Sequence, residues 1–106
     1  MVQKQNKNIN ILKKFKKELK EIEISKLILF GSRARGDFEK DSDFDILIIS
    51  KKFKGVKWNE RSLNIYLSWK EKAPLEVLCY TPKEFEKGKK QVGIIQEAVK
   101  EGIIID

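Results

Sequence analysis

Two aspartates separated by one residue are the first candidates for chemistry in this sequence. Asp43 and Asp45 flank Phe44 at the start of an apolar run that continues through 46–49. On a β-strand the side chains of residues i and i+2 point to the same face, so the two carboxylates would lie side by side. Neighbouring carboxylates repel each other, and a divalent cation between them removes that cost. Such oxygen ligands favour magnesium, calcium or manganese, and magnesium commonly combines one or two carboxylates with substrate phosphates.

A glycine–serine pair upstream is a candidate phosphate site. Gly31 and Ser32 follow the apolar run 26–30. A strand that ends in glycine and passes into a helix leaves free backbone N–H groups that can bind phosphate, and a serine hydroxyl can add a hydrogen bond. The guanidinium groups of Arg33 and Arg35 could neutralise a polyphosphate. The pattern Gly-x-x-x-x-Gly-Lys-[Ser/Thr] does not occur, so this is not a P-loop.

Glu76 is the candidate for a third acid. It lies between Leu75 and Val77 in the apolar run 75–80, so its side chain should alternate out of the core. If that strand neighbours the one over 43–49, Glu76 can face the two aspartates. There it could hold a second metal ion or take the proton from an attacking hydroxyl. The alternative is an ordinary charge on an edge strand.

The hydrophobic pattern predicts the elements that position these groups. We expect helices over 8–22, 58–71 and 92–101, a helix that starts at Thr81-Pro82 with Glu84 in its first turn, and strands over 26–30, 43–49, 75–80 and 103–105. In the helix over 58–71, Leu63, Tyr66 and Leu67 are expected to point inward.

Strands and helices do not alternate as they would in a doubly wound parallel sheet. We therefore expect an α+β fold (a two-layer α/β arrangement), with a small mixed sheet and helices packed mainly on one face. The length of 106 residues fits one domain over 1–106.

Composition excludes several chemistries. There is no histidine and one cysteine, Cys79, which excludes histidine-based catalysis, histidine-ligated zinc and an intrachain disulfide. The net charge of +7 is concentrated in residues 1–20, where seven lysines and one acid give +6. A nucleic-acid-binding protein that uses this segment and the lysines of 51–57 is therefore a minor alternative. No apolar run could cross a bilayer, and we expect a cytoplasmic protein.

The segment from Gly31 to Ile48 closely resembles the signature of the minimal nucleotidyltransferases of the DNA polymerase β-like superfamily. That signature is Gly-Ser, ten residues and Asp-x-Asp, often with Ala-Arg-Gly after Gly-Ser-x and serine before the first aspartate, and all of these are present here. The resemblance extends over a catalytic core at 24–82, preceded by a basic amphipathic helix at 1–22. The family's third acid is commonly aspartate, and here it maps onto Glu76.

The resemblance implies a magnesium-dependent nucleotidyl transfer, with manganese as the alternative ion. A hydroxyl attacks the α-phosphate of a nucleoside triphosphate, AMP from ATP being the expected case, while Asp43 and Asp45 hold the ions and Gly31 and Ser32 hold the triphosphate. Small members of this family commonly act as antitoxins of HEPN-domain ribonucleases, and some are thought to transfer AMP to a tyrosine of that partner. The competing hypothesis is an inactive nucleotidyltransferase-fold module that masks a toxin or binds a nucleotide without turnover.

Overall fold

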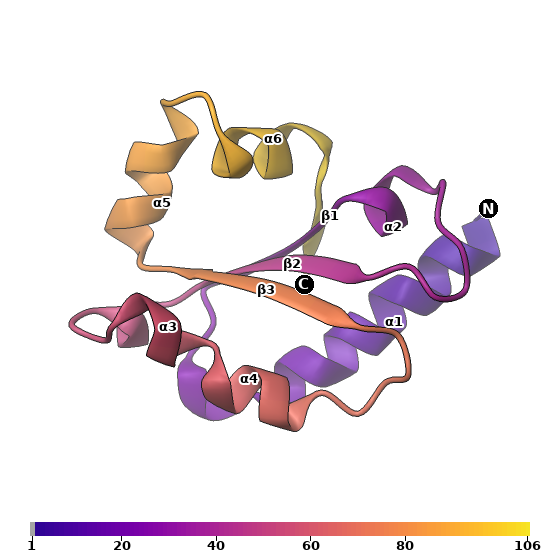
Figure 1. Cartoon of the computed structure of the whole chain (residues 1–106), viewed down its shortest axis with the longest axis horizontal. Helices are drawn as coiled ribbons and strands as arrows, with labels where there is room; N and C mark the ends of the chain where they lie inside the picture. Colours follow the sequence, from indigo (N-terminus) through magenta and orange to yellow (C-terminus); the bar gives the residue numbers. More distant parts are fainter. Residues whose placement is uncertain (1) are drawn as a thin grey trace.

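The computed structural model describes residues 2–106, with side chains from Gln5 onward. One four-stranded sheet is flanked by helices, which confirms the expected α+β fold (Figure 1). In chain order the elements are α1 (Val2–Glu18), a 3-10 turn (Lys20–Ile22), β1 (Lys26–Phe30), α2 (Ser32–Arg35), β2 (Phe44–Ile49), a 3-10 turn (Lys51–Phe53), α3 (Trp58–Arg61), α4 (Leu63–Ser68), β3 (Leu75–Tyr80), α5 (Pro82–Lys89), α6 (Ile94–Glu101) and β4 (Ile103–Ile105).

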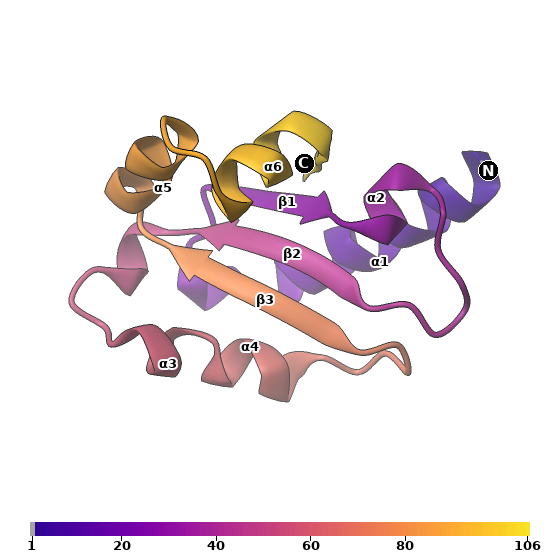
Figure 2. The same cartoon turned by 45° about the horizontal axis from the view of Figure 1, so that its top comes forward.

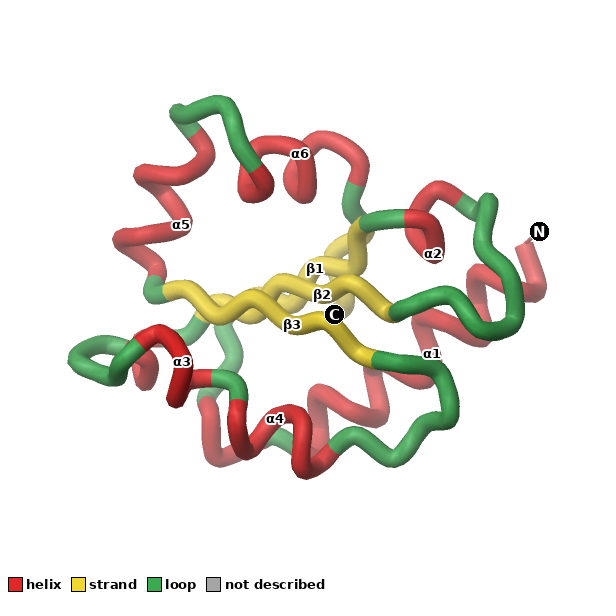
Figure 3. The backbone as a smooth tube through the Cα atoms, in the orientation of Figure 1, coloured by secondary structure: helices red, strands yellow, loops and turns green. Residues whose placement is uncertain are grey.

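The sheet is mixed and has the strand order β3-β2-β1-β4. β1 is antiparallel to both β2 and β4, whereas β2 and β3 are parallel. The C-terminal end of β1 and the N-terminal ends of β2 and β3 therefore lie at the same end of the sheet. Figure 2 shows these three strands side by side, and Figure 3 shows that the loops leading into β2 and β3 lie at one end of the sheet.

The larger part of the core lies between one face of the sheet and α1 with α4. The expected amphipathic character of the first helix is confirmed, since Leu12 and Phe15 of α1 are buried, as is Leu19 directly after it. Trp69 joins this helix to the sheet, because its ring packs edge-on against both Phe15 and Phe44, at 5.0 and 5.2 Å between centroids. Full burial of each such side chain stabilises the fold by about 1.5–3 kcal/mol.

The opposite face of the sheet is also covered, by α5 and α6. Phe85, Ile95 and Ala98 pack there against Ile28 and Leu47. Figure 1 shows α5 and α6 on one side of the sheet and α1, α3 and α4 on the other. The expectation that helices pack mainly on one face is thus corrected to unequal coverage of both faces, because successive residues of β1 and β2 are apolar and each face must be shielded from water.

The crossover between β2 and β3 differs from the prediction. The helix expected over 58–71 is two short helices, α3 and α4, that meet at Ser62. The prediction that Leu63 and Leu67 point inward was wrong, since these residues are 59% and 67% exposed. Tyr66 is 43% exposed, but its hydroxyl reaches the sheet and accepts a hydrogen bond from the Val77 N–H of β3 at 3.1 Å.

A different set of crossover side chains faces the sheet. Ile65 is fully buried, and the side chain of Arg61 is only 8% exposed. Arg61 Nη1 donates to the carbonyl oxygen of Cys79 at 3.2 Å. Arg61, Ile65 and Trp69 follow one another at intervals of four residues, so the inward stripe includes a charged residue that hydrophobic periodicity cannot detect.

Most of the lysine side chains that the structure describes in α1 are exposed to solvent. Lys7, Lys13, Lys14 and Lys17 are exposed. Lys16 differs, because its ammonium group donates to the carbonyl oxygen of Ile105 at 3.2 Å and so connects α1 to β4. Within residues 2–106 no helix combines the length and the apolar character that crossing a membrane requires.

Candidate active site

The structure brings together the three acids that the sequence analysis selected. Asp43 directly precedes β2, Asp45 is its second residue, and Glu76 is the second residue of β3. Asp45 and Glu76 are register partners in the parallel ladder. One carboxylate oxygen from each of the three residues lies within 4.8 Å of the other two, so the group could share metal ions.

Gly31 lies against this group because β1 ends where β2 begins. Phe30 pairs with Asp45 in the β1–β2 ladder, so the next residue, Gly31, passes beside the aspartate side chain. Its φ is +75°, a left-handed conformation that glycine adopts without strain. A Cβ atom at this position would overlap the Oδ2 atom of Asp45. Glycine is thus required here both by backbone conformation and by the carboxylate beside it.

An open cleft of about 470 Å³ lies over this turn, a volume within the range of small-molecule sites. Ser32 begins the short helix α2 and lines the cleft. The full lining is Phe30, Gly31, Ser32, Arg35, Ser42, Asp43, Asp45, Ile94, Glu97 and Glu101. Glu76 is not part of this lining, but it pairs with Asp45 in the β2–β3 ladder, and its carboxylate belongs to the three-acid group.

The surroundings of Asp45 oppose the ionisation of its carboxyl group. Burial, followed by the negative charges of Asp43 and Glu76, raises the pKa of Asp45 above its ordinary value, and the nearby guanidinium of Arg35 offsets part of the rise. A cation placed among the three groups would remove this repulsion. The donor set, all carboxylate oxygens at one open cleft, fits a hard divalent ion such as magnesium or manganese.

Arg35 is the arginine that the structure places in the cleft. Its side chain is 47% exposed and lies 3.5 Å from Asp37 and 3.4 Å from Glu101. The contribution of Glu101 was not predicted from the sequence. It follows from the pairing of β4 with β1, which an apolar run of three residues after Gly102 does not specify on its own.

Arg33 lies elsewhere, which corrects the expectation that it neutralises a polyphosphate. It is 6% exposed, and its guanidinium stacks on the ring of Phe44 at 4.0 Å. Its three nitrogens donate to the carbonyl oxygens of Ser42 and Lys40 and to the side-chain oxygen of Asn8, at 3.0–3.1 Å. Burial lowers the pKa of Arg33, which still remains charged at neutral pH. Arg33 therefore fixes the loop that leads into Asp43.

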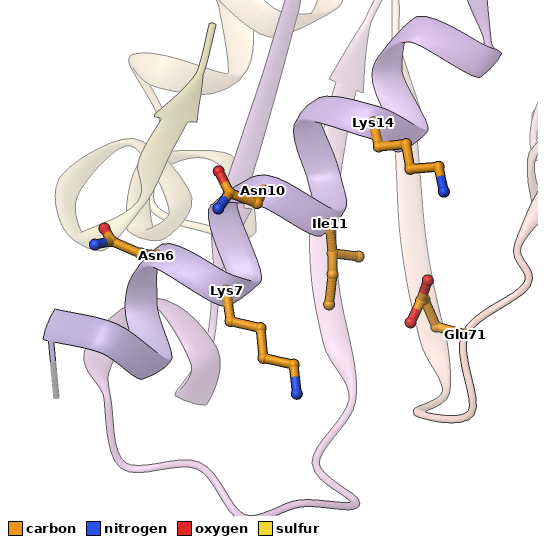
Figure 4. A pocket seen from close by; sticks show the side chains of 6 residues that line it. All are labelled: Asn6, Lys7, Asn10, Ile11, Lys14 and Glu71. Carbon is orange, nitrogen blue, oxygen red and sulfur yellow. The ribbon is translucent and has the colours of Figure 1, made fainter.

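A second hollow runs along the first helix and lacks such a constellation. It is lined by Asn6, Lys7, Asn10, Ile11, Lys14 and Glu71. Figure 4 shows Lys7, Ile11 and Lys14 projecting from α1, with Glu71 on a separate segment. This hollow contains one carboxylate, whereas the group that can share a cation lies at the other site.

The family model of the nucleotidyltransferase domain matches residues 12–105. The chain belongs to this nucleotidyltransferase family. The match begins within α1 and extends through β4, so it covers the Gly31–Ser32 turn and all three acids.

Two relatives of this nucleotidyltransferase come from Methanocaldococcus jannaschii, and each bears the name "putative protein adenylyltransferase". The first is 40% identical over 60 residues, which cover 54% of this chain and 61% of the relative. The second is 65% identical over 26 residues, which cover 24% of this chain and 26% of the relative. The matched segments thus span less than two thirds of either relative.

The crystal structure of a "putative nucleotidyltransferase" from Sulfolobus solfataricus has the same fold. It superposes with a TM-score of 0.69 over 97% of this chain and 83% of the other, at 21% sequence identity. Conservation of the fold at this identity shows that the sheet and its flanking helices are the common framework of the two nucleotidyltransferases.

Proposed function

We propose that this nucleotidyltransferase transfers AMP from ATP to a hydroxyl group of a partner protein in a magnesium-dependent reaction. The observation that carries the proposal is the meeting of Asp43, Asp45 and Glu76 within 4.8 Å, beside the Gly31–Ser32 turn. The names of the two archaeal relatives support protein adenylylation as the form of transfer.

The three acids are the proposed metal ligands, and magnesium is favoured over manganese. When bound, the ions would stabilise negative charge on the attacking and leaving oxygens of the phosphoryl group. Asp45 is the central ligand, because it lies between Asp43 along the strand and Glu76 across the ladder. Glu76 has one methylene more than aspartate, and its carboxylate still reaches the group.

Gly31, Ser32 and Arg35 are the proposed nucleotide-binding residues. The Gly31 N–H and the Ser32 hydroxyl supply donors for phosphate oxygens, and the exposed Arg35 guanidinium adds positive charge at the same cleft. Arg33 takes no direct part in this proposal, because its donors are occupied by protein oxygens.

The chemical step joins the hydroxyl oxygen of the acceptor to the α-phosphorus. The bond from that phosphorus to the bridging oxygen of pyrophosphate breaks, and the hydroxyl proton passes to a carboxylate or to water. The cleft is open to solvent, which suits an acceptor presented by another protein. A HEPN-domain protein whose hydroxyl-bearing side chain receives AMP is the proposed partner.

The direct test is transfer of radiolabel from α-labelled ATP. The purified chain is incubated with Mg²⁺, the nucleotide and a purified HEPN-domain protein, and protein-bound label is measured after denaturing electrophoresis. We expect labelled partner with the wild type and none with Asp43→Asn or Asp45→Asn. Asp41→Asn is the matched control, because Asp41 is an exposed acid of the same loop and lies outside the metal-binding group.

The outcome separates the enzyme from the inactive-module alternative. Undiminished labelling by the Asp43→Asn, Asp45→Asn double variant would contradict the assigned chemistry. A partner that is bound and inhibited equally well without ATP, and is never labelled, would favour the binding module. Parallel reactions with α-labelled GTP, CTP and UTP define the base preference.

A further inference from the structure

The carboxylate of Glu101 occupies the donors of the proposed phosphate site. Its Oε1 atom accepts a hydrogen bond from the Gly31 N–H at 3.1 Å and lies 3.4 Å from Arg35 Nη1. These are a backbone donor and a cation that converge on one oxygen. A phosphate oxygen of a bound nucleotide would require the same two groups.

The fold places Glu101 there through the β1–β4 ladder. Leu29 pairs with Ile103 in the antiparallel β1–β4 ladder. Continuing this register two residues beyond Leu29 and two residues before Ile103 places Gly31 opposite Glu101. Gly102 allows the close approach, because a Cβ atom there would overlap the carbonyl oxygen of Ala98 and lie against the side chain of Ile28. The position of the carboxylate is thus set by sheet pairing and helix packing, and not by a free loop.

This position is electrostatically unfavourable for an acid. Glu101 is the last residue of α6, where the helix dipole and unpaired carbonyls favour cations. It also faces a cleft that already contains Asp43 and Asp45. Two donors from the phosphate site, the Gly31 N–H and Arg35, compensate for this placement.

We propose that Glu101 stands in for a nucleotide phosphate in the free protein and must be displaced when the triphosphate binds. The inference rests on the proposed function, since it assumes that the Gly31–Ser32 turn and Arg35 take the phosphates. Glu101 thereby sets the affinity of the site: nucleotide binds only when its phosphates, with their accompanying cations, compete successfully for Gly31 and Arg35. By occupying the Gly31 N–H and the Arg35 guanidinium, Glu101 also prevents anions weaker than the triphosphate from binding to these two groups.

The test compares two alanine variants of α6. Glu101→Ala removes the carboxylate that contacts Gly31 and Arg35. Glu97→Ala removes another exposed acid that lines the cleft but lies outside the contacts described for Gly31 and Arg35. Binding of ATP with Mg²⁺ and of inorganic triphosphate is measured by titration calorimetry. We expect Glu101→Ala to lower the Kd for both ligands roughly three- to tenfold, the effect of one partly exposed charged contact, and Glu97→Ala to have a clearly smaller effect.

Three outcomes decide the question. An unchanged or raised Kd in Glu101→Ala would overturn the inference, as would an equal gain in Glu97→Ala, which would mean that general repulsion alone is at work. Glu101→Gln keeps the size of the side chain and serves if the alanine variant does not fold; it should also bind ATP more tightly than the wild type.

Failure of this inference is distinguishable from failure of the proposed function. ATP binding that tightens in Glu101→Ala, without any labelled partner, would disprove transfer and leave the role of Glu101 in place. Normal labelling by the wild type together with identical ATP affinities for wild type and Glu101→Ala would disprove the role of Glu101 and leave transfer in place.

Discussion

Gly31 and Asp45 meet just beyond the last pair of the β1–β2 ladder, with no room for a side chain between them. This relationship explains why a glycine and an aspartate fourteen positions apart belong to one site. Gly31 is required for its positive φ, and the Asp45 carboxylate occupies the space that a side chain at position 31 would fill.

Replacing Gly31 by alanine should therefore destabilise the protein and abolish transfer. Gly55→Ala is the matched control, because Gly55 has a nearly equal φ of +79° but no atom within 4 Å of the added Cβ. Both variants place an alanine at positive φ, which costs about 1–2 kcal/mol, and Gly31 also has a ψ of −160°, in a region that is populated almost only by glycine. Gly31→Ala should lose about 1–3 kcal/mol more from overlap with Asp45. The free energies of unfolding are measured with denaturant, and equal losses in the two variants would contradict the predicted contact.

Neutralising Asp45 should stabilise the metal-free protein at neutral pH. The folded pKa of Asp45 lies above the unfolded value, so ionising this residue disfavours the folded state. Stability from this residue is complete below the unfolded pKa of about 3.9 and is lost as pH rises through the folded pKa. In thermal unfolding with EDTA, the Tm of Asp45→Asn relative to the wild type should therefore increase by a few degrees as the pH rises from below the unfolded pKa to above the folded pKa. A difference that stays constant from pH 3 to pH 8 would count against the electrostatic account, and Mg²⁺ should raise the Tm of the wild type alone.

The two arginines of the motif should respond differently to substitution by lysine. Arg33 is buried with three hydrogen-bond acceptors, and lysine cannot satisfy them in the same plane, so Arg33→Lys should lose about 2–3 kcal/mol of unfolding free energy. Arg35→Lys should lose less than about 0.5 kcal/mol, because its ion pairs are exposed. Denaturant unfolding gives both values. A larger loss for Arg35→Lys would show that the buried network is not what holds the loop before Asp43.

A pH-dependent contact outside the site involves Glu84 at the start of α5. Its carboxylate accepts from Arg61 Nη1 at 2.6 Å and Nη2 at 3.1 Å and from the Thr81 N–H at 2.8 Å. The Arg61 contact lowers the pKa of Glu84, so its stabilisation is present above the unfolded value of about 4.3 and is lost as pH falls through the folded pKa. Glu84→Gln should lower the Tm by a few degrees at pH 7 and by little at pH 3.

Glu86→Gln provides the comparison for that experiment. Glu86 lies on the same helix, and its pair with Lys89 at 3.0 Å is exposed on both sides. Its loss should change the Tm little at either pH. A similar acid dependence in both variants would indicate that the charge of the helix, and not the Arg61 contact, controls the pH response.

Strand positions and the acidic group could be predicted from the sequence for physical reasons. The strands over 26–30 and 75–80 are apolar runs bounded by Gly31 and by Pro74 and Pro82, so their limits coincide with those of β1 and β3. If this segment is assumed to be a strand, the i and i+2 spacing of Asp43 and Asp45 places both side chains on the same face of the sheet. The helix start at Thr81-Pro82, with Glu84 in the first turn, was likewise predicted, and the structure shows that Thr81 and Glu84 form the reciprocal hydrogen bonds of a capping box.

The remaining features depend on tertiary contacts with partners outside the local secondary structure. Arg33 and Arg61 are buried because carbonyl oxygens outside their own helices accept their hydrogen bonds. The residues next to each arginine in the sequence do not indicate where those acceptors lie. Glu101 reaches Gly31 only because β4 pairs with β1. Without knowledge of the tertiary partner that accepts its hydrogen bonds or pairs with its charge, a charged residue is predicted to be exposed.

The parallel ladder between β2 and β3 has a consequence for how this small protein tolerates change. Register pairs from Phe44–Leu75 to Ile49–Tyr80 set Glu76 against Asp45, and the crossover through α3 and α4 supplies none of the three carboxylates. Substitutions on the exposed face of that connecting stretch can therefore accumulate while the ligand geometry stays fixed, as long as Arg61, Ile65 and Trp69 keep their contacts with the core.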